Sequence, residues 1–108
     1  MNRLKRKTAA SIGDLMMEYI KHSPLAPQLN SRRIFEAWDA ASGAERYTIR
    51  RFFRDGKLYI TVNSSVVCSQ LQFQRDVLVE KMNEILRRDE LFIADNAKVG
   101  FVKELIIK

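Results

Sequence analysis

The sequence predicts an α+β domain in which helices pack on a three-stranded sheet. Three observations indicate this class: apolar residues at helical spacing in three stretches, a tight-turn signal between two β-rich segments, and an alternating apolar run near the C-terminus. The expected order of elements is α-α-β-β-α-β. With 108 residues and 46% hydrophobic content, the chain is sufficient for one core and too short for two.

The first predicted helix begins at Ser11, which forms a capping-box-like pair with Asp14. Its apolar positions follow the spacing of a helical stripe: Ile12, Leu15, Met16, Tyr19 and Ile20. Pro24 and Pro27 disfavour helical geometry in the residues before them and are expected to separate this helix from the next. Residues 1–10 are expected to form a basic flexible arm, and residues 11–108 a single domain.

A second helix is predicted from Asn30 or Ser31 to Gly43. Its apolar face carries Ile34, Phe35, Trp38 and Ala41. Gly43 lies where a left-handed C-terminal cap needs a residue without a Cβ. The indole of Trp38 is therefore expected in the core.

Residues 46–54 are rich in β-branched and aromatic side chains and predict a strand that pairs with residues 58–63. Asp55 and Gly56 between them suit the positive φ angles of a tight hairpin. The facing of the first strand is ambiguous, because either face of a regular strand here would carry both apolar residues and arginines. A bulge would reconcile the two patterns.

From Ser65 to about Arg88, helical spacing predicts one long core helix, and the Ser64-Ser65 pair is placed to cap it. Its apolar positions are Val67, Leu71, Leu78, Met82 and Ile85. Residues 89–96 indicate a polar connection. Residues 98–107 predict the last strand, with one face formed by Val99, Phe101, Leu105 and Ile107.

The net charge of +6 is unevenly distributed. Residues 1–57 hold 12 Lys or Arg against 6 Asp or Glu, whereas residues 58–108 hold 7 of each. This excess favours an anionic partner such as single-stranded DNA or RNA, and solubility is the alternative explanation. The candidate nucleic-acid-binding residues lie on the hairpin and the arm: Arg50, Arg51, Arg54, Lys57, Arg3, Lys5, Arg6 and Lys7.

Catalysis is not expected, because a chain with one histidine, His22, and one cysteine, Cys68, offers few ways to assemble a nucleophile, a base and an orienting group. No metal site or cofactor is predicted. The glycines are too far apart for a Walker loop or for the Gly-x-x-Gly loop of typical KH domains: Gly13, Gly43, Gly56 and Gly100.

The chain is expected in the cytoplasm and not at a membrane. No apolar stretch approaches the about 20 residues needed to span a bilayer. Asp14 and Glu18 interrupt the segment where a secretory signal needs an uncharged apolar core. A single cysteine fits a reducing compartment.

Aromatic residues alternate with arginines across the hairpin, as on sheets that bind single strands. The alternative is packing of the sheet. Packing is favoured for Phe53, while both interpretations remain open for Phe52 and Tyr59.

The ordered pattern of residues from 38 to 83 resembles the DciA-like family of bacterial proteins. The residues that carry it are Trp38, Gly43, Thr48, Asp55, Gly56, Leu58, Ile60, Val62, Ser64, Ser65, Leu71, Leu78 and Asn83. The resemblance covers most of the chain. It implies a KH-like fold without the Gly-x-x-Gly loop, in which Trp38, Gly43, Gly56, Ser64, Ser65 and Leu71 are structural.

The same resemblance implies a role in bringing the replicative helicase to DNA. We therefore expect a DNA-replication accessory protein that contacts the helicase through protein surface and single-stranded DNA through arginines. An RNA-binding or ribosome-associated KH-like module is the alternative, since a basic strand serves RNA equally well.

Overall fold

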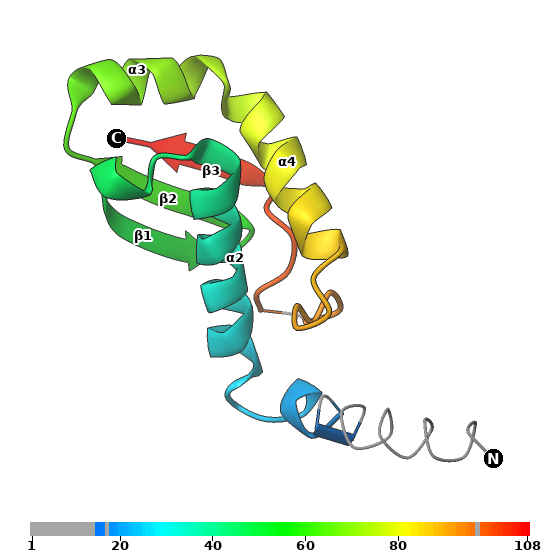
Figure 1. The fold of residues 1–108 in the computed structure, drawn as a ribbon. Coiled ribbons are helices and arrows are strands. Elements are labelled where there is room, and N and C mark those ends of the chain that lie inside the picture. Colours follow the sequence, from blue (N-terminus) through cyan, green and yellow to red (C-terminus); the bar gives the residue numbers. More distant parts are fainter. Residues whose placement is uncertain (1–14, 17, 97) are drawn as a thin grey trace.

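The computed structural model of the chain describes residues 15–16, 18–96 and 98–108 (Figure 1). Residues 15–16 and 18–21 are helical. The remaining elements are α2 (Ala26–Ser42), η1 (Glu45–Tyr47), β1 (Thr48–Arg54), β2 (Lys57–Val62), α3 (Ser65–Phe73), α4 (Arg75–Arg87) and β3 (Glu104–Ile107). The predicted α+β class is confirmed. Within the described residues, no helix combines the length and the apolar character that crossing a membrane requires.

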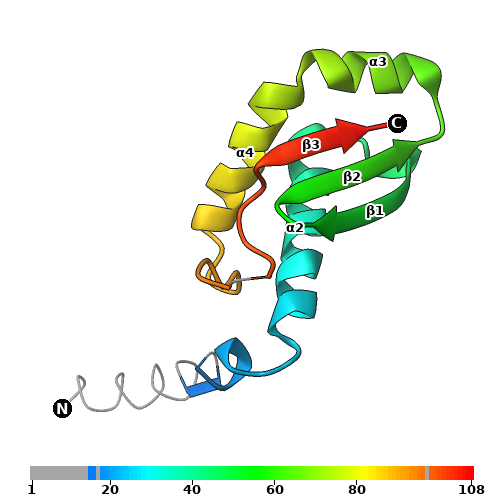
Figure 2. The same cartoon turned by 180° about the vertical axis from the view of Figure 1, so that it is seen from behind.

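The sheet is mixed and has the strand order β1-β2-β3. Strands β1 and β2 are antiparallel, and β2 and β3 are parallel. Helices α2 and α4 pack against each other on one side of the sheet, whereas the view from behind in Figure 2 shows the three strands uncovered. This uncovered side is called the open face below.

The core lies between the two helices and the covered side of the sheet. Its largest fully buried apolar side chains are Ile34, Trp38, Leu58, Ile60, Leu78, Met82, Leu86 and Leu105. These residues come from α2, β2, α4 and β3. Within α2 and α4 the buried residues recur at helical spacing, as an apolar stripe requires.

Helix α2 begins at Ala26, four to five residues before the predicted start. Pro27 lies in the first turn of α2 and does not interrupt the helix. The first N–H groups of a helix have no acceptor within the helix, so the missing N–H of proline costs no hydrogen bond at this position. The predicted end is confirmed: Gly43 has φ 65°, and its N–H donates to Asp39 O at 3.0 Å.

The hairpin between β1 and β2 is confirmed, with φ 52° at Asp55 and 79° at Gly56. The register shifts between Thr48 and Arg50, so the strand is irregular at its start. From Arg50 to Arg54 the pairing is regular, and each face of this part of the strand still carries arginine beside an aromatic residue. The strand starts at Thr48 rather than at Arg46, because residues 45–47 form the short helix η1.

The predicted long core helix is two helices that meet at Gln74. Helix α3 is held against the end of the sheet, where Gln72 Nε2 donates to Ile107 O at 3.0 Å. Helix α4 instead lies along α2. The bend lets each half cover a different part of the core. Apolar spacing along the chain does not predict where such a bend lies.

The last strand is shorter than predicted, because residues 98–103 form a loop that side chains hold in place. Asn83 donates from Nδ2 to Val102 O at 2.8 Å and accepts from Val102 N at 2.9 Å. Asn30, which is fully buried, likewise donates to Ile93 O and Val99 O and accepts from Ile93 N. Two asparagines therefore replace the strand pairing that was expected for this segment.

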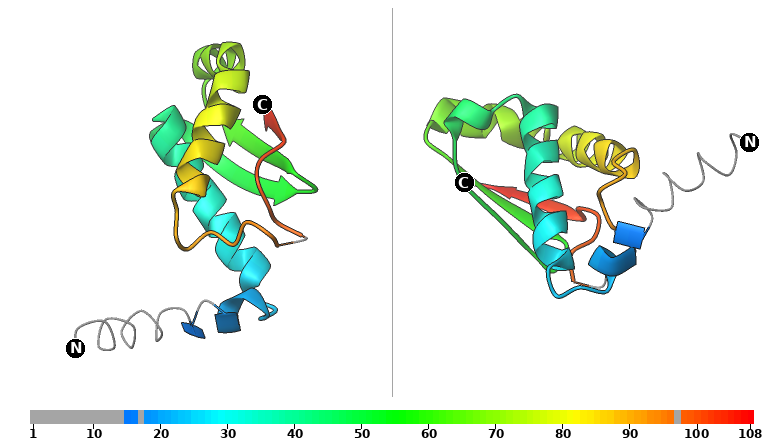
Figure 3. Two further views of the ribbon diagram at one scale, coloured as in Figure 1. Left: turned by 90° about the vertical axis from the view of Figure 1, so that its right-hand side faces the viewer. Right: turned by 60° about the horizontal axis from the view of Figure 1, so that its bottom comes forward.

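The described part of the first helix, residues 15–16 and 18–21, leaves most of its apolar side chains exposed, whereas its apolar stripe predicts a buried face. Leu15, Met16 and Tyr19 are 68%, 61% and 78% exposed. Figure 3 shows this segment in blue at the end of the molecule away from the sheet. Helices α2 and α4 already cover the side of the sheet that carries the core residues, so a third helix has no place on that side. The predicted cap at Ser11 and the arm lie outside the described residues.

Candidate nucleic-acid interface

The open face is formed by the side chains that alternate with the core residues of the sheet. Phe53, Leu58 and Ile60 are buried against the helices, so their neighbours in each strand point the other way. The open face therefore carries Arg50, Phe52, Arg54, Lys57, Tyr59, Thr61, Glu104 and Ile106, followed by Lys108.

Strand register arranges these residues in three rows across the sheet. The middle row is apolar, because Phe52 is paired with Tyr59 and Tyr59 with Ile106. One flanking row is Arg50, Thr61 and Lys108, where Lys108 continues β3 by donating its N–H to Ile60 O at 2.9 Å. The other flanking row is Arg54, Lys57 and Glu104.

The apolar row and the first flanking row enclose a shallow hollow of about 450 Å³. Residues of the open face that line it are Arg50, Phe52, Tyr59, Thr61, Ile106 and Lys108. The rings of Phe52 and Tyr59 have centroids 5.9 Å apart and planes inclined at 42°. Phe52 is 50% exposed, so its ring is accessible to a ligand.

The open face is cationic. Among the described residues, Arg50, Lys57 and Lys108 take part in no ion pair, and Arg54 has only a contact of 3.6 Å with Asp55, both side chains being exposed. An exposed ion pair of this kind contributes little free energy and holds neither side chain firmly in place. The four cations therefore remain available to an anionic ligand.

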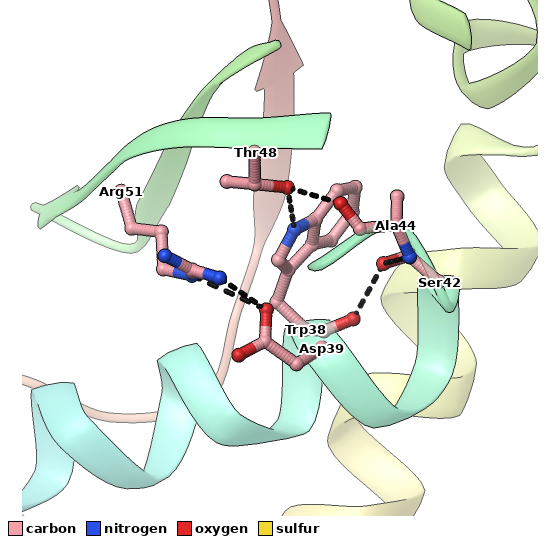
Figure 4. A network of polar contacts seen from close by, with 6 residues as sticks. All are labelled: Trp38, Asp39, Ser42, Ala44, Thr48 and Arg51. Carbon is pink, nitrogen blue, oxygen red and sulfur yellow. Dashed lines mark hydrogen bonds and ion pairs between the residues drawn. The ribbon is translucent and has the colours of Figure 1, made fainter. Parts of the chain in front are cut away.

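Arg51 lies on the opposite side of β1 from Arg50 and Arg54. Its Nε and Nη2 both donate to Asp39 Oδ1, at 3.2 and 2.6 Å, and both side chains are 24% exposed (Figure 4). The guanidinium is thus neutralised by α2. We assign Arg51 to the packing of β1 on α2 and leave it out of the cationic surface.

The Trp38 side chain connects the end of α2 to the start of β1 (Figure 4). Its Nε1 donates to Thr48 Oγ1 at 3.1 Å, and Thr48 Oγ1 donates to Ala44 O at 2.8 Å. Ser42 Oγ donates to Trp38 O at 2.7 Å and accepts from Ala44 N at 3.1 Å. Trp38 is fully buried, which confirms its expected place in the core.

Other residues of the family pattern also lie in structural positions. Ser64 Oγ accepts from Val67 N at 3.3 Å and caps α3, which begins at Ser65. Leu71 is the buried residue of α3. A Cβ at Gly56 would lie 2.9 Å from Lys103 Cδ, so this turn position favours glycine for its space as well as its φ angle.

The outer face of α3, formed by Val66, Ser69, Gln70 and Phe73, is a second exposed surface. Phe73 is 93% exposed and Val66 67%. They are seven residues apart and so lie on the same side of the helix. Residues 58–74 carry no charge, and Ser69, Gln72 and Phe73 line a hollow of about 310 Å³. This surface is uncharged and partly apolar.

Sequence reasoning did not identify Thr61, Ile106 or Lys108 as neighbours of the hairpin cations. The sequence predicts that Leu105 and Ile107 face the core, and strand alternation then turns Ile106 and Lys108 outward. No local pattern in the sequence, however, predicts that β3 pairs with β2. Arg3, Lys5, Arg6 and Lys7 lie outside the described residues. In the part of the chain that the structure describes, no three His, Cys, Asp or Glu residues are placed to hold a metal ion.

Comparison with known families shows a match over most of the chain. The family model described as "Dna[CI] antecedent, DciA" matches residues 11–91, three quarters of the chain. No curated protein and no solved structure matched.

Proposed function

The chain belongs to the DciA family. We propose that it is a non-enzymatic accessory protein of DNA replication in the cytoplasm, which contacts both the replicative helicase and single-stranded DNA. The observation that carries the proposal is the presence of two exposed surfaces with different chemistry. The open face of the sheet is cationic and aromatic, and the outer face of α3 is uncharged.

The open face supports the contact with DNA. Arg50, Arg54, Lys57 and Lys108 present positive charge to phosphates, and phosphate contacts supply most of the affinity of proteins that bind single strands. Binding should therefore weaken steeply as salt is added. An RNA-binding module would use the same surface, so the affinities for DNA and RNA of one sequence are to be compared. Tighter binding of RNA would indicate recognition of the 2′-hydroxyl and favour the RNA-binding alternative.

The outer face of α3 supports the contact with the helicase. A surface without cations attracts no polyanion, whereas aromatic residues are enriched and charged residues depleted at the centre of protein interfaces. Phe73 is the exposed aromatic side chain there. Since Gln72 ties α3 to the end of β3, this surface is held in place before a partner arrives.

The test is co-elution of purified replicative helicase with the nuclease-treated protein at moderate salt. The unaltered chain is expected to co-elute, and Phe73→Ser is expected to reduce the bound fraction at least severalfold. Because Phe73 is 93% exposed, its replacement should leave the melting temperature almost unchanged. Ile49→Ser is the matched control, since Ile49 is 63% exposed but lies on β1.

Full binding by Phe73→Ser would place the helicase contact on another surface. Failure of the unaltered chain to co-elute would overturn the helicase part of the proposal.

A further inference from the structure

We propose that the hollow on the open face binds the bases of a single-stranded nucleic acid, which stack on Phe52 and Tyr59 while the phosphates follow the row of Arg50, Thr61 and Lys108. This inference rests on the proposed binding of single strands. Its positive charge alone would let the open face bind only phosphates. The hollow adds a site for bases.

The exposure of Phe52 is the first argument. Phe53, the next residue, is 8% exposed and fills the core, whereas Phe52 is 50% exposed on a face that no described helix covers. An apolar ring in that position is exposed to solvent. It can bury this surface by stacking on a base, and every base has a flat π-face.

The second argument is the continuity of the apolar row. Phe52, Tyr59 and Ile106 lie on three neighbouring strands and are paired directly across the sheet. With strands about 4.8 Å apart, the row is roughly 10 Å long. Sheets with exposed aromatic pairs stack two or three bases in this way.

The position of the charges gives the path of the backbone. Arg50 and Lys108 stand at the two ends of one flanking row with no acidic residue between them, and they line the hollow together with Thr61. The other flanking row ends at Glu104, which repels a phosphate. The phosphates are therefore placed on the side of Arg50 and Lys108, with the bases turned toward the rings.

The hollow also selects for single strands. Its volume of about 450 Å³ lies within the range of about 300–1,000 Å³ that is usual for sites of small organic groups. The bases of a duplex are stacked on one another and offer no free face to Phe52 or Tyr59. A duplex can thus contact the cations but not the rings.

The experiment compares two single-stranded DNA probes of equal length, one of thymidine nucleotides and one with abasic sites at every internal position. Both probes carry the same phosphates, so a difference in affinity reports contact with bases. By fluorescence anisotropy at low salt, the unaltered chain should bind the thymidine probe roughly five- to a hundredfold more tightly.

Two variants locate the difference. Phe52→Ala with Tyr59→Ala should lose the preference for the thymidine probe and keep its affinity for the abasic probe. Phe52→Leu retains an apolar cover for the sheet and should also reduce the preference, which separates loss of the ring from loss of the fold. Ile49→Ala, an exposed position of β1 outside the rows, should change neither affinity.

Equal affinity of the unaltered chain for both probes would overturn the base-binding site and leave phosphate binding intact. Absence of binding to either probe at low salt would instead overturn the proposed binding of single strands.

Discussion

Trp38 and Phe73 are aromatic residues on helices, yet one is fully buried and the other is 93% exposed. Trp38 lies on the stripe of α2 that faces the sheet, and its Nε1 has a partner in Thr48. Phe73 is the last residue of α3, on the side turned away from the core. Burial, rather than residue type, thus assigns Trp38 to stability and leaves Phe73 free for the partner contact that we propose.

Replacement of Trp38 by alanine is expected to lower the free energy of unfolding by about 3–5 kcal/mol, because it removes a large buried ring and leaves a cavity. Thr48→Val should cost about 1–3 kcal/mol, since it leaves the indole N–H without its acceptor. Urea denaturation measures both. Thr48→Ser retains the hydroxyl and is the control for the second variant. An unchanged midpoint for Trp38→Ala would contradict the assignment.

Asn30 shows how one buried polar side chain can replace a secondary-structure element. Its amide makes three hydrogen bonds of 2.7, 2.7 and 2.8 Å to the backbone of Ile93 and Val99. A loop buried against a helix needs such partners for its N–H and C=O groups. The polar residue in the middle of the α2 sequence is therefore structural.

At the scale of elements, strand β1 separates its arginines into two groups. The irregularity between Thr48 and Arg50 places Arg50 on the open face and Arg51 beside Asp39. Neighbouring arginines that are equivalent in sequence thus have different surroundings. We therefore propose Arg50 and Arg54 for the contact with nucleic acid, whereas Arg51 is paired with Asp39.

Arg50→Gln and Arg51→Gln form a matched pair, because each removes one positive charge from adjacent positions of the same strand. Arg50→Gln should reduce the slope of log affinity against log salt by about 0.7, the loss of one phosphate contact on a single strand. Arg51→Gln should leave the slope unchanged and lower the melting temperature, since Asp39 loses its partner. Equal flattening by both variants would show that Arg51 also contacts phosphates.

At the scale of the whole molecule, the two surfaces lie on different elements, the open face on the strands and the second surface on α3 (Figures 1 and 2). The contacts that we propose with a helicase and with a single strand therefore do not compete for one surface. Residues 1–10 lie outside the described residues, and their four cations suit DNA better than a protein interface.

A chain that starts at Ser11 is therefore expected to co-elute with the helicase as the full chain does, while its affinity for single-stranded DNA falls. Gel filtration of nuclease-treated samples at moderate salt measures the first, and anisotropy measures the second. Loss of co-elution in the shortened chain alone would move the helicase contact to the arm.

Several features of the fold follow from neighbouring residues alone. Asp55 and Gly56 accept the positive φ angles of the hairpin, Gly43 accepts those of the helix cap, and helical spacing places Trp38 on a buried face. Each of these depends on backbone preferences or on periodicity within a few residues. They are readable before any tertiary contact is known.

The tertiary structure determined which of two adjacent arginines is exposed, where the core helix bends, and that β3 lies beside β2. It also decided that the stripe of the first helix remains uncovered within the described residues. Each outcome depends on what another part of the chain offers: Asp39 for Arg51, Ile107 for Gln72, and a sheet already covered by α2 and α4. An amphipathic segment specifies that one side is to be buried, and the partner that buries it is set by packing over long distances in sequence.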